Sequence, residues 1–556
     1  EMPKMTGGRF IAEFLEKSGV DAVFYVPTIL SRPLAEMDNM KIKRVLAHAE
    51  KSAAYMADGY ARASGKPGIC AAQAVGAANL AAGLRDALMG NSPVIALSGG
   101  RKSMEKHKGA YQENDDFPVF QALTKANFQV DQVERLPDLM RQAFREATTG
   151  NPGPVNLQLA GNNGQIEDDY ADLEVLVEGR YGKAPSHRFT PPLEEIKEAI
   201  AKINTAKKPV IVLGGGARIS DAGDEALQFS KKTGIPIATS VASYNLIPED
   251  YELYIGVPGS YSRECTNKIL SDADLFIFIG SSTGGQVTHF WKIPSKDTRV
   301  IQIGIDPSDL GRNYPNDISL LGDAKSTLQM LLNEDLKRLE IEDWRSHSIS
   351  LVENWKNSLK PLRESNNIPI RPERMMKELS EIIPEGSVVV SDTGHTAMWT
   401  VQNLWLNKKW NFIRCAGSLG WGFPAAMGAK CAFPDKDVYC LTGDGGLWYH
   451  FTELETAVRC DIPTITIVNN NNALNQEHDI FMNAYDGKPS NRWTEMWYFN
   501  KVSFAELANN MGAFGISVTD PSDIKDAVRE AKKSKKPAIV EIEGDVSALA
   551  PTAWSK

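Results

Sequence analysis

A glycine-rich turn and a run of asparagines carry the most specific chemistry in the chain. Gly443-Asp444-Gly445-Gly446 follows the apolar run 438–441, and the asparagines 469–472 come about two dozen residues later. Glycines let a backbone approach a phosphate closely, and the N-terminus of a following helix offers free N–H groups to it. The Asp444 carboxylate and the Asn471 amide oxygen are ligands that suit Mg²⁺ bound to phosphates. The pattern predicts a strand–turn–helix–strand unit that binds a phosphate through Mg²⁺, with an ordinary βαβ unit as the alternative.

Taken together, the two motifs resemble the signature of the thiamine diphosphate (ThDP) enzymes. In that family the Asp, one Asn of the pair and a backbone carbonyl two residues later hold the metal on the diphosphate. The resemblance implies Asp444, Asn471 and Ala473 as metal ligands. The run of four asparagines leaves the position of the second ligand open by about one residue. As cofactor contacts the resemblance implies Gly443, Gly445 and Gly446.

Glu50 begins a segment rich in small residues, 48–62, which we expect to be a closely packing helix that ends near Gly65. A carboxylate at a helix N-terminus is explained by the helix dipole alone. However, the pattern from Ala54 to Arg62 resembles the pyrimidine-binding domain of the acetolactate synthase and pyruvate oxidase branch. There a carboxylate hydrogen-bonds the pyrimidine of the cofactor, which then acts as a base. The resemblance therefore implies Glu50 as a catalytic residue.

The same resemblance extends to further residues, each of which has a plainer structural explanation. Gln112 falls where that branch has a catalytic Gln that could hydrogen-bond the substrate carbonyl, but it could also be a turn residue. Leu419 falls where relatives have a bulky side chain that supports the bent cofactor, but it could also be a core residue. Other implied cofactor contacts are His395, Thr396, Gly417 and Asn79. The expected substrate-pocket residues are Thr28, Ile29, Leu30, Gln73 and Gln476.

A chain of 556 residues is too long for one hydrophobic core. Strand-like apolar runs that alternate with helical segments indicate an α/β protein with three doubly wound parallel-sheet domains. We expect a pyrimidine-binding domain at 1–166, a middle domain at 190–335 and a diphosphate-binding domain at 371–548. We also expect a helix over 447–460, a strand over 462–468 and a charged helical connection over 334–363.

The middle domain contains Gly214-Gly215-Gly216 directly after the apolar run 209–213. This is a weak dinucleotide signal, because the Gly-x-Gly-x-x-Gly spacing is missing. Flavin-binding relatives often have an Arg after the strand that ends here at Gly280, whereas this chain continues with Ser281-Ser282-Thr283. The sequence therefore argues against FAD.

The composition, with 42% hydrophobic and 24% charged residues, is that of a soluble globular protein. A net charge of −9 argues against a nucleic-acid or anionic-membrane partner. The six cysteines form no Cys-x-x-Cys pair, and we see no signal peptide or membrane-spanning run, so we expect a cytoplasmic protein. In the family, the two cofactor-binding domains at one site come from different subunits, which implies a homodimer or homotetramer acting on a small-molecule substrate.

Three functions remain open. The first is decarboxylation of a 2-oxo acid followed by carboligation, as in acetolactate synthase. The second is ThDP-dependent cleavage of an acyloin, a 1,2-diketone or a 2-hydroxyacyl-CoA. We expect the first function, although two segments, 28–30 and 473–478, depart from the acetolactate synthase pattern and so weaken it. The third is a cofactor-binding protein without catalysis, which the presence of Glu50, Asp444 and Asn471 disfavours.

Overall fold

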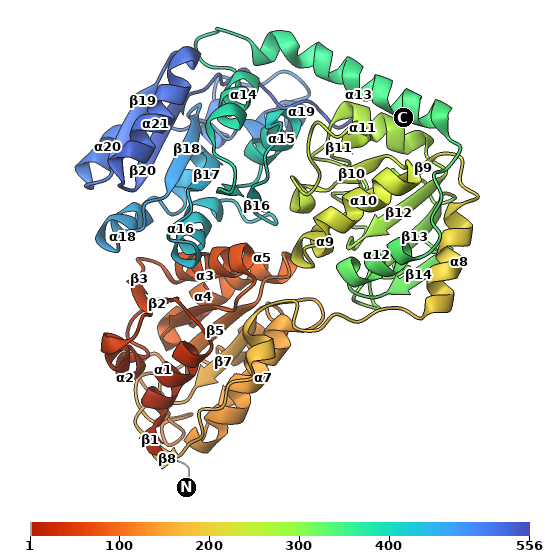
Figure 1. Ribbon diagram of the computed structural model, residues 1–556. Helices are drawn as coiled ribbons and strands as arrows, with labels where there is room; N and C mark the ends of the chain where they lie inside the picture. The colour runs from red at the N-terminus through yellow and green to blue at the C-terminus, as the bar shows by residue number, and fades with distance from the viewer. Residues whose placement is uncertain (1–2) are drawn as a thin grey trace.

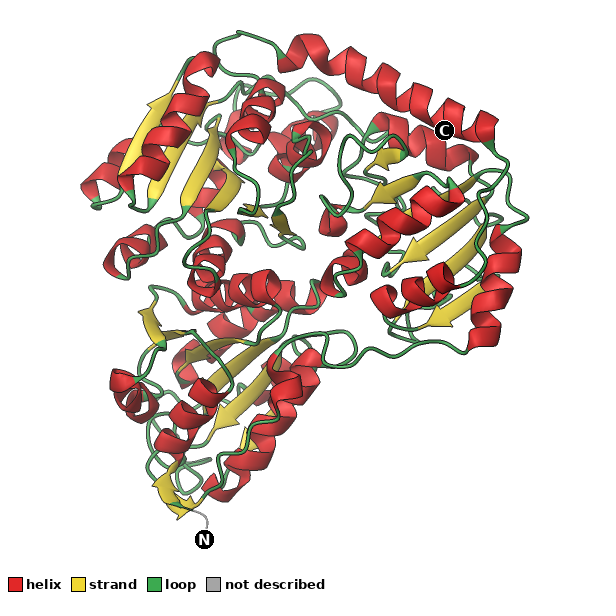
Figure 2. Ribbon diagram, viewed as in Figure 1, coloured by secondary structure: helices red, strands yellow, loops and turns green. Residues whose placement is uncertain are grey.

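The computed structural model describes residues 3–556 as three lobes, each built on a six-stranded sheet (Figure 1). The strands of each large sheet are parallel, and helices lie on both faces of the sheets (Figure 2). Parallel neighbours need crossover connections, which the helices supply. The predicted α/β class with three parallel-sheet domains is confirmed. None of the helices in residues 3–556 is both long and apolar enough to cross a lipid bilayer.

The N-terminal lobe has the strand order β3-β2-β4-β5-β7-β6. A separate antiparallel pair, β1 with β8, returns the chain to this lobe at residues 170–172, beyond the predicted domain end at 166. The elements are β1 (Lys4–Thr6), α1 (Gly7–Lys17), β2 (Ala22–Val26), α2 (Ser31–Glu36), β3 (Lys43–Leu46), α3 (Glu50–Ser64), β4 (Gly68–Ala72), α4 (Ala77–Ala82), α5 (Leu84–Met89), β5 (Val94–Gly99), α6 (Phe117–Gln121), β6 (Ala126–Val130), α7 (Leu136–Thr148), β7 (Val155–Leu159) and β8 (Tyr170–Asp172).

The middle lobe has the strand order β11-β10-β9-β12-β13-β14. A long helix, α13 (Glu342–Arg363), follows it and runs along the outside of the middle and C-terminal lobes (Figure 1). The predicted helical connection is therefore confirmed from residue 342 onwards, whereas none of residues 334–341 is helical. The other elements are α8 (Leu193–Ile203), β9 (Pro209–Leu213), α9 (Gly215–Ile219), α10 (Gly223–Thr233), β10 (Ile237–Thr239), β11 (Tyr254–Gly256), α11 (Glu264–Asp272), β12 (Leu275–Ile279), β13 (Arg299–Gly304), β14 (Ile318–Leu321) and α12 (Ala324–Asn333).

The C-terminal lobe has the strand order β16-β15-β17-β18-β20-β19. Its elements are α14 (Pro372–Ile382), β15 (Val388–Ser391), α15 (His395–Asn403), β16 (Asn411–Arg414), α16 (Gly422–Ala432), β17 (Val438–Gly443), α17 (Asp444–Trp448), α18 (Glu453–Arg459), β18 (Ile465–Asn470), α19 (His478–Ala484), α20 (Phe504–Asn510), β19 (Phe514–Val518), α21 (Ile524–Ser534) and β20 (Ala538–Glu543).

Two expectations for this lobe need correction. The helix expected over 447–460 is two short helices, α17 and α18, because the chain turns between them. There the Nδ1 atom of His450 lies 2.9 Å from the carbonyl oxygen of Gly420, and its ring packs edge-on against Tyr55. The strand expected over 462–468 begins only at Ile465 and continues into the asparagines. Pro463 has no N–H group to donate to a neighbouring strand, which explains the later start.

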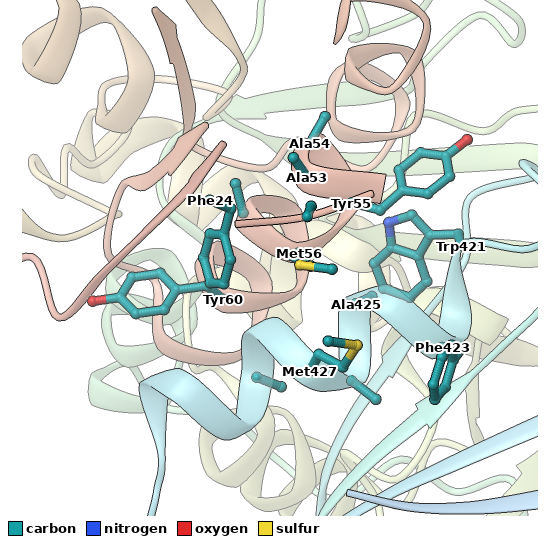
Figure 3. Packing of buried hydrophobic residues seen from close by; sticks show 14 of the residues in the cluster. Phe24, Ala53, Ala54, Tyr55, Met56, Tyr60, Trp421, Phe423, Ala425 and Met427 are labelled. Atoms are coloured by element: carbon teal, nitrogen blue, oxygen red, sulfur yellow. The ribbon is translucent and has the colours of Figure 1, made fainter. Parts of the chain in front are cut away.

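Helix α3 of the N-terminal lobe packs against α16 of the C-terminal lobe (Figure 3). Residues 52–62 of α3 are all buried, as expected for a helix surrounded by protein. A Cβ atom on Gly59 would lie 1.9 Å from the carbonyl oxygen of Ala425, and one on Gly428 would lie 1.7 Å from that of Met56. The two backbones therefore touch at glycines, and the predicted close packing of this small-residue helix is confirmed.

Candidate active site

The glycine turn and the asparagine run lie together because the strands before them are neighbours. β17 pairs with β18 in parallel, with Gly443 opposite Asn469. Asp444 follows directly and is only 2% exposed. Burial raises the pKa of Asp444 to about 7, although backbone N–H groups, including those of Ala473 and Asn471, oppose the rise. Its Oδ2 atom is buried and has no hydrogen-bond partner among residues 3–556. A cation stabilises a buried carboxylate that has an oxygen without a hydrogen-bond partner.

The structure also separates the asparagines that the sequence left open. Asn470 turns away, because its Nδ2 atom donates to Glu541 Oε2 at 3.1 Å. Asn471 accepts a hydrogen bond from the backbone N–H of Ala473 at 3.2 Å, so Asn471 and Ala473 are the residues beside Asp444. One carboxylate, one amide oxygen and one backbone carbonyl are hard oxygen donors. They fit Mg²⁺, which usually keeps water and phosphate as its other ligands.

β15, the neighbour of β17 on its other side, brings a further group to this edge of the sheet. Gly394 has φ of +74°, and α15 begins immediately after it with His395. Burial lowers the pKa of His395 to about 4, so the imidazole is neutral at physiological pH, and its Nδ1 atom is buried without a partner. The hydroxyl oxygen of Thr396 lies 3.4 Å from where a Cβ atom on Gly443 would be. His395 and Thr396 thus lie at the same sheet edge as Gly443 and Asp444.

Neighbouring atoms leave no room for side chains at the glycines of the turn. A Cβ atom on Gly445 would lie 2.3 Å from Leu474 Cδ2, and one on Gly446 would lie 2.7 Å from Thr442 Oγ1. Leu419 lies half-buried on the turn that leads into α16, two residues after the exposed Gly417.

Glu50 occupies the corresponding edge of the N-terminal lobe. It is the first residue of α3, and the Nδ2 atom of Asn79 donates to its Oε2 atom at 3.4 Å. A Cβ atom on Gly76 would lie 2.6 Å from Glu50 Oε1, so the carboxylate packs directly onto this glycine. Gly76 and Asn79, which come more than 25 residues after Glu50, therefore both contact its carboxylate.

Two of the predicted pocket residues lie at the same edge. Gln73 donates to the carbonyl oxygen of Pro27 at 3.1 Å, and the carbonyl oxygen of Thr28 accepts from Asn162 at 3.2 Å. Asn162 also accepts from the backbone N–H of Ala74 at 2.8 Å. Asn162 thus links the loops after β2, β4 and β7. The sequence analysis missed it because no motif surrounds it.

Ile29 and Leu30 differ from Thr28. Their side chains are 1% and 0% exposed and belong to the core of the N-terminal lobe. Only their backbone atoms remain available to the substrate pocket in which we expected them. Leu30 directly precedes α2 with φ of +58°, and its backbone N–H donates to the buried carboxylate of Glu167.

The remaining two candidates lie on loops. Gln112 has φ of +62° in the loop between β5 and α6. Gln476 donates to the hydroxyl of Tyr261 in the middle lobe at 3.1 Å, and its Oε1 atom lies 2.9 Å from a Cβ position on Gly394. Within residues 3–556, no hydrogen bond joins Gln112 or Glu50 to Asp444.

A cavity of about 240 Å³ is lined by residues of all three lobes, among them Arg62, Arg218 and Arg414 and the glycines of the 214–216 turn. Arg218 donates to the carbonyl oxygen of Arg62 at 3.2 Å. Burial lowers the pKa of Arg218 to about 10, and the charge of Arg62 adds to the effect. Asp309 and Asp323 line the cavity as well, and in the described part of the chain neither Arg218 nor Arg414 forms an ion pair.

Comparison with known families and proteins agrees with this geometry. Three family models match in order: the N-terminal TPP binding domain of thiamine pyrophosphate enzymes at residues 5–119, the central domain at 196–331 and the C-terminal TPP binding domain at 392–542.

Among curated proteins, a probable acetolactate synthase large subunit of Methanocaldococcus jannaschii is 33% identical over 98% of this chain and 93% of its own length. The acetolactate synthase large subunit of Corynebacterium glutamicum is 29% identical over 97% of this chain and 86% of its own. The isozyme 1 large subunit of Escherichia coli is 28% identical over 98% and 94%. The chain therefore belongs to the thiamine diphosphate-dependent enzymes of the acetolactate synthase and pyruvate oxidase family.

Proposed function

We propose that this enzyme uses ThDP and Mg²⁺ to remove CO₂ from a 2-oxo acid and to join the remaining acyl carbon to a second carbonyl compound. The observation that carries the proposal is the buried, unpartnered Oδ2 atom of Asp444 beside Asn471 and Ala473. Curated relatives named as acetolactate synthases support the choice of reaction.

When bound, thiamine diphosphate supplies a carbon nucleophile for the substrate carbonyl and takes up the electron pair released with CO₂. Glu50 holds or releases a proton at a pyrimidine nitrogen, and the N–H of Asn79 orients its carboxylate. Gln112 donates its amide N–H to the substrate oxygen. This last role rests on the family resemblance of the segment around Gln112.

Asp444, Asn471 and the carbonyl oxygen of Ala473 would hold Mg²⁺, which neutralises the charge of the diphosphate. Thr396 offers a hydroxyl and His395 a neutral imidazole to the same group. The glycines of the 443–446 turn keep side chains out of the space that the phosphates need.

We propose a homodimer or homotetramer in which a second copy of the chain covers the face around Asp444. Trp448, Tyr449, Tyr498 and Phe499 are exposed, and Phe499 lies 3.7 Å from a Cβ position on the adjacent Gly445. Exposed aromatic side chains are enriched in protein interfaces. Light scattering coupled to size-exclusion chromatography tests this assembly, and a monomer at micromolar concentration would contradict it.

We also propose that the enzyme contains no flavin. The turn after β12 has no Arg, and the carbonyl oxygen of its buried Thr283 accepts hydrogen bonds from Trp291 at 3.0 Å and Asn313 at 2.9 Å. A cavity of about 240 Å³ is also below the roughly 300–1,000 Å³ of drug-sized ligand sites. The absorption spectrum of the purified protein tests this point, and a flavin band would refute it.

All six cysteines are unpaired, which supports a reducing compartment such as the cytoplasm.

The main test measures CO₂ release from a panel of 2-oxo acids with ThDP and Mg²⁺ present. Wild type is compared with Glu50→Gln and with a matched control, Glu225→Gln, a half-buried acid in the middle lobe. We expect release that falls at least about hundredfold in Glu50→Gln and is unchanged in the control.

Exchange of the C2 proton of ThDP for deuterium gives a second readout that needs no substrate. Glu50-dependent exchange without CO₂ release from any acid would replace the proposal by the cleavage of an acyloin, a 1,2-diketone or a 2-hydroxyacyl-CoA. Absence of both would contradict a ThDP mechanism.

A further inference from the structure

The side chain of Asn162 lies at one edge of the N-terminal sheet, where β2, β4, β5 and β7 end. These strands are consecutive neighbours in the sheet and run parallel to one another. Their carboxyl ends therefore share one edge, which is where open α/β sheets bind their ligands. Asn162 belongs to the loop that follows β7.

Both polar atoms of the Asn162 amide are used by backbone groups of other loops. Its Oδ1 atom accepts from the N–H of Ala74, after β4, at 2.8 Å, and its Nδ2 atom donates to the carbonyl oxygen of Thr28, after β2, at 3.2 Å. A Cβ atom on Gly99, the last residue of β5, would lie 1.8 Å from the same Oδ1 atom. The amide therefore packs directly onto this glycine and contacts the ends of all three neighbouring strands.

The backbone at Asn162 explains why this residue type stands there. The φ angle is +56° at Asn162 and +94° at Gly161. Among residues with a side chain, Asn and Asp adopt this left-handed region most readily. The position thus needs a left-handed backbone and a short group that both donates and accepts, a combination that asparagine provides.

The contact with Ala74 leads to Glu50. Ala74 begins a short helical turn, Ala74–Gly76, which the side chain of the preceding Gln73 does not cap. The first N–H groups of such a turn need partners from outside it, and Asn162 supplies one for Ala74. At the other end of the turn, a Cβ atom on Gly76 would lie 2.6 Å from Glu50 Oε1. Displacement of the turn therefore moves the surface on which the Glu50 carboxylate rests.

We propose that Asn162 is a positioning residue of the active site: through Ala74 it holds the turn that supports Glu50, and through Thr28 it holds the adjacent loop of the substrate pocket. The proposal rests on the proposed function in one respect, that Glu50 acts on the cofactor. All of these groups belong to one lobe of one chain, so their arrangement does not depend on which copy supplies the diphosphate-binding lobe. The competing interpretation is that Asn162 only stabilises the loop after β7.

Two substitutions separate the two contacts. Asn162→Gly removes the whole amide and keeps a residue that adopts positive φ freely. Asn162→Asp tolerates the same backbone and keeps an acceptor for Ala74, but it turns an oxygen toward the carbonyl oxygen of Thr28. In Asn162→Gly we expect amide hydrogen exchange to accelerate about two- to tenfold in both the 26–32 and the 73–80 peptides. In Asn162→Asp only the 26–32 peptide should change.

The functional readout is exchange of the C2 proton of ThDP in the presence of Mg²⁺. We expect at least about tenfold slower exchange in Asn162→Gly, because the support of Glu50 is displaced. Asn162→Asp should exchange at close to the wild-type rate, because the contact with Ala74 is kept. With any 2-oxo acid that releases CO₂, Asn162→Asp should raise KM more than it lowers kcat, since only the Thr28 loop has moved.

The matched control is Asn245 of the middle lobe. It has φ of +72°, and its amide donates to the carbonyl oxygen of Lys408 at 3.1 Å and accepts from the N–H of Trp410 at 2.9 Å. Both partners precede β16, so they lie at the amino end of a parallel strand, at the edge of the sheet opposite Asp444. Asn245→Gly removes the same kinds of hydrogen bond and should leave C2 exchange unchanged.

Wild-type C2 exchange in a folded Asn162→Gly enzyme overturns the proposal. Asn162→Asp exchanging as slowly as Asn162→Gly also overturns it, as does an equal slowing in Asn245→Gly, which would point to general destabilisation. Failure of the wild type itself to exchange the C2 proton would instead overturn the proposed function, and this proposal with it. If Asn162→Gly does not fold, Asn162→Ser, whose side chain is too short to bridge both partners, undergoes the same comparison.

Discussion

Replacing Gly76 by alanine would move the Glu50 carboxylate without changing its charge. The new Cβ atom would lie 2.6 Å from Glu50 Oε1 and 2.8 Å from its Cγ atom. Because carbon contacts settle at about 3.5–4.0 Å, the carboxylate has to withdraw by roughly 1 Å. The backbone accepts alanine, since φ of Gly76 is −92°. A misplacement of about 1 Å in a catalytic group costs on the order of hundredfold in rate, or about 2.7 kcal/mol.

The assay is exchange of the C2 proton of ThDP, followed by turnover once a substrate is found. Gly153→Ala is the matched control, because its Cβ atom would meet only the flexible side chain of Lys125 at 3.3 Å in the same lobe. We also expect the double variant Gly76→Ala/Glu50→Gln to be no slower than Glu50→Gln alone, because both changes act on one carboxylate. Wild-type exchange in a folded Gly76→Ala enzyme would refute the placement of Glu50 at the cofactor.

Three further predictions concern metal binding, pH and packing. Asp444→Asn should weaken Mg²⁺-dependent ThDP binding at least about hundredfold in calorimetry, while the apo protein keeps or gains thermal stability because a buried charge is removed. Burial raises the pKa of Glu167 to about 7, so the folded protein holds a proton that the unfolded chain releases, and stability should fall as pH rises from about 4.5 to 7. Glu167→Gln should flatten this fall by at most about 3 kcal/mol in unfolding measured across that pH range. Gly428→Ala should destabilise the protein by about 3 kcal/mol, seen as a lower midpoint of thermal unfolding, because its Cβ atom would lie 1.7 Å from the backbone oxygen of Met56.

The parts of the fold that the sequence predicts well are those with strong local patterns. The strand predicted before the glycine turn forms as β17, because residues 438–441 are the continuous apolar run of a buried parallel strand. The prediction of one helix over 447–460 is wrong because the break in the helix depends on contacts of His450 with Gly420 and Tyr55, which are distant in the sequence.

The residues of the candidate site also fall into those that a local sequence pattern predicts and those that it does not. Spacing alone points to Asp444 and Asn471, since both end neighbouring strands and a parallel sheet brings such ends together. Asn162 has an ordinary residue type and no motif around it, and its importance comes only from backbone groups that the fold brings to it. No local pattern records such a partner.

The contact between α3 and α16 also has a consequence for synthesis of the chain on the ribosome. Helix α3 ends at Ser64, whereas α16 begins at Gly422, about 360 residues later. The ribosome adds about 5–20 residues per second, so synthesis of the segment between the two helices takes on the order of 20–70 s. During that interval the small-residue face of α3 is uncovered, so this face is where we expect chaperones to bind the unfinished protein.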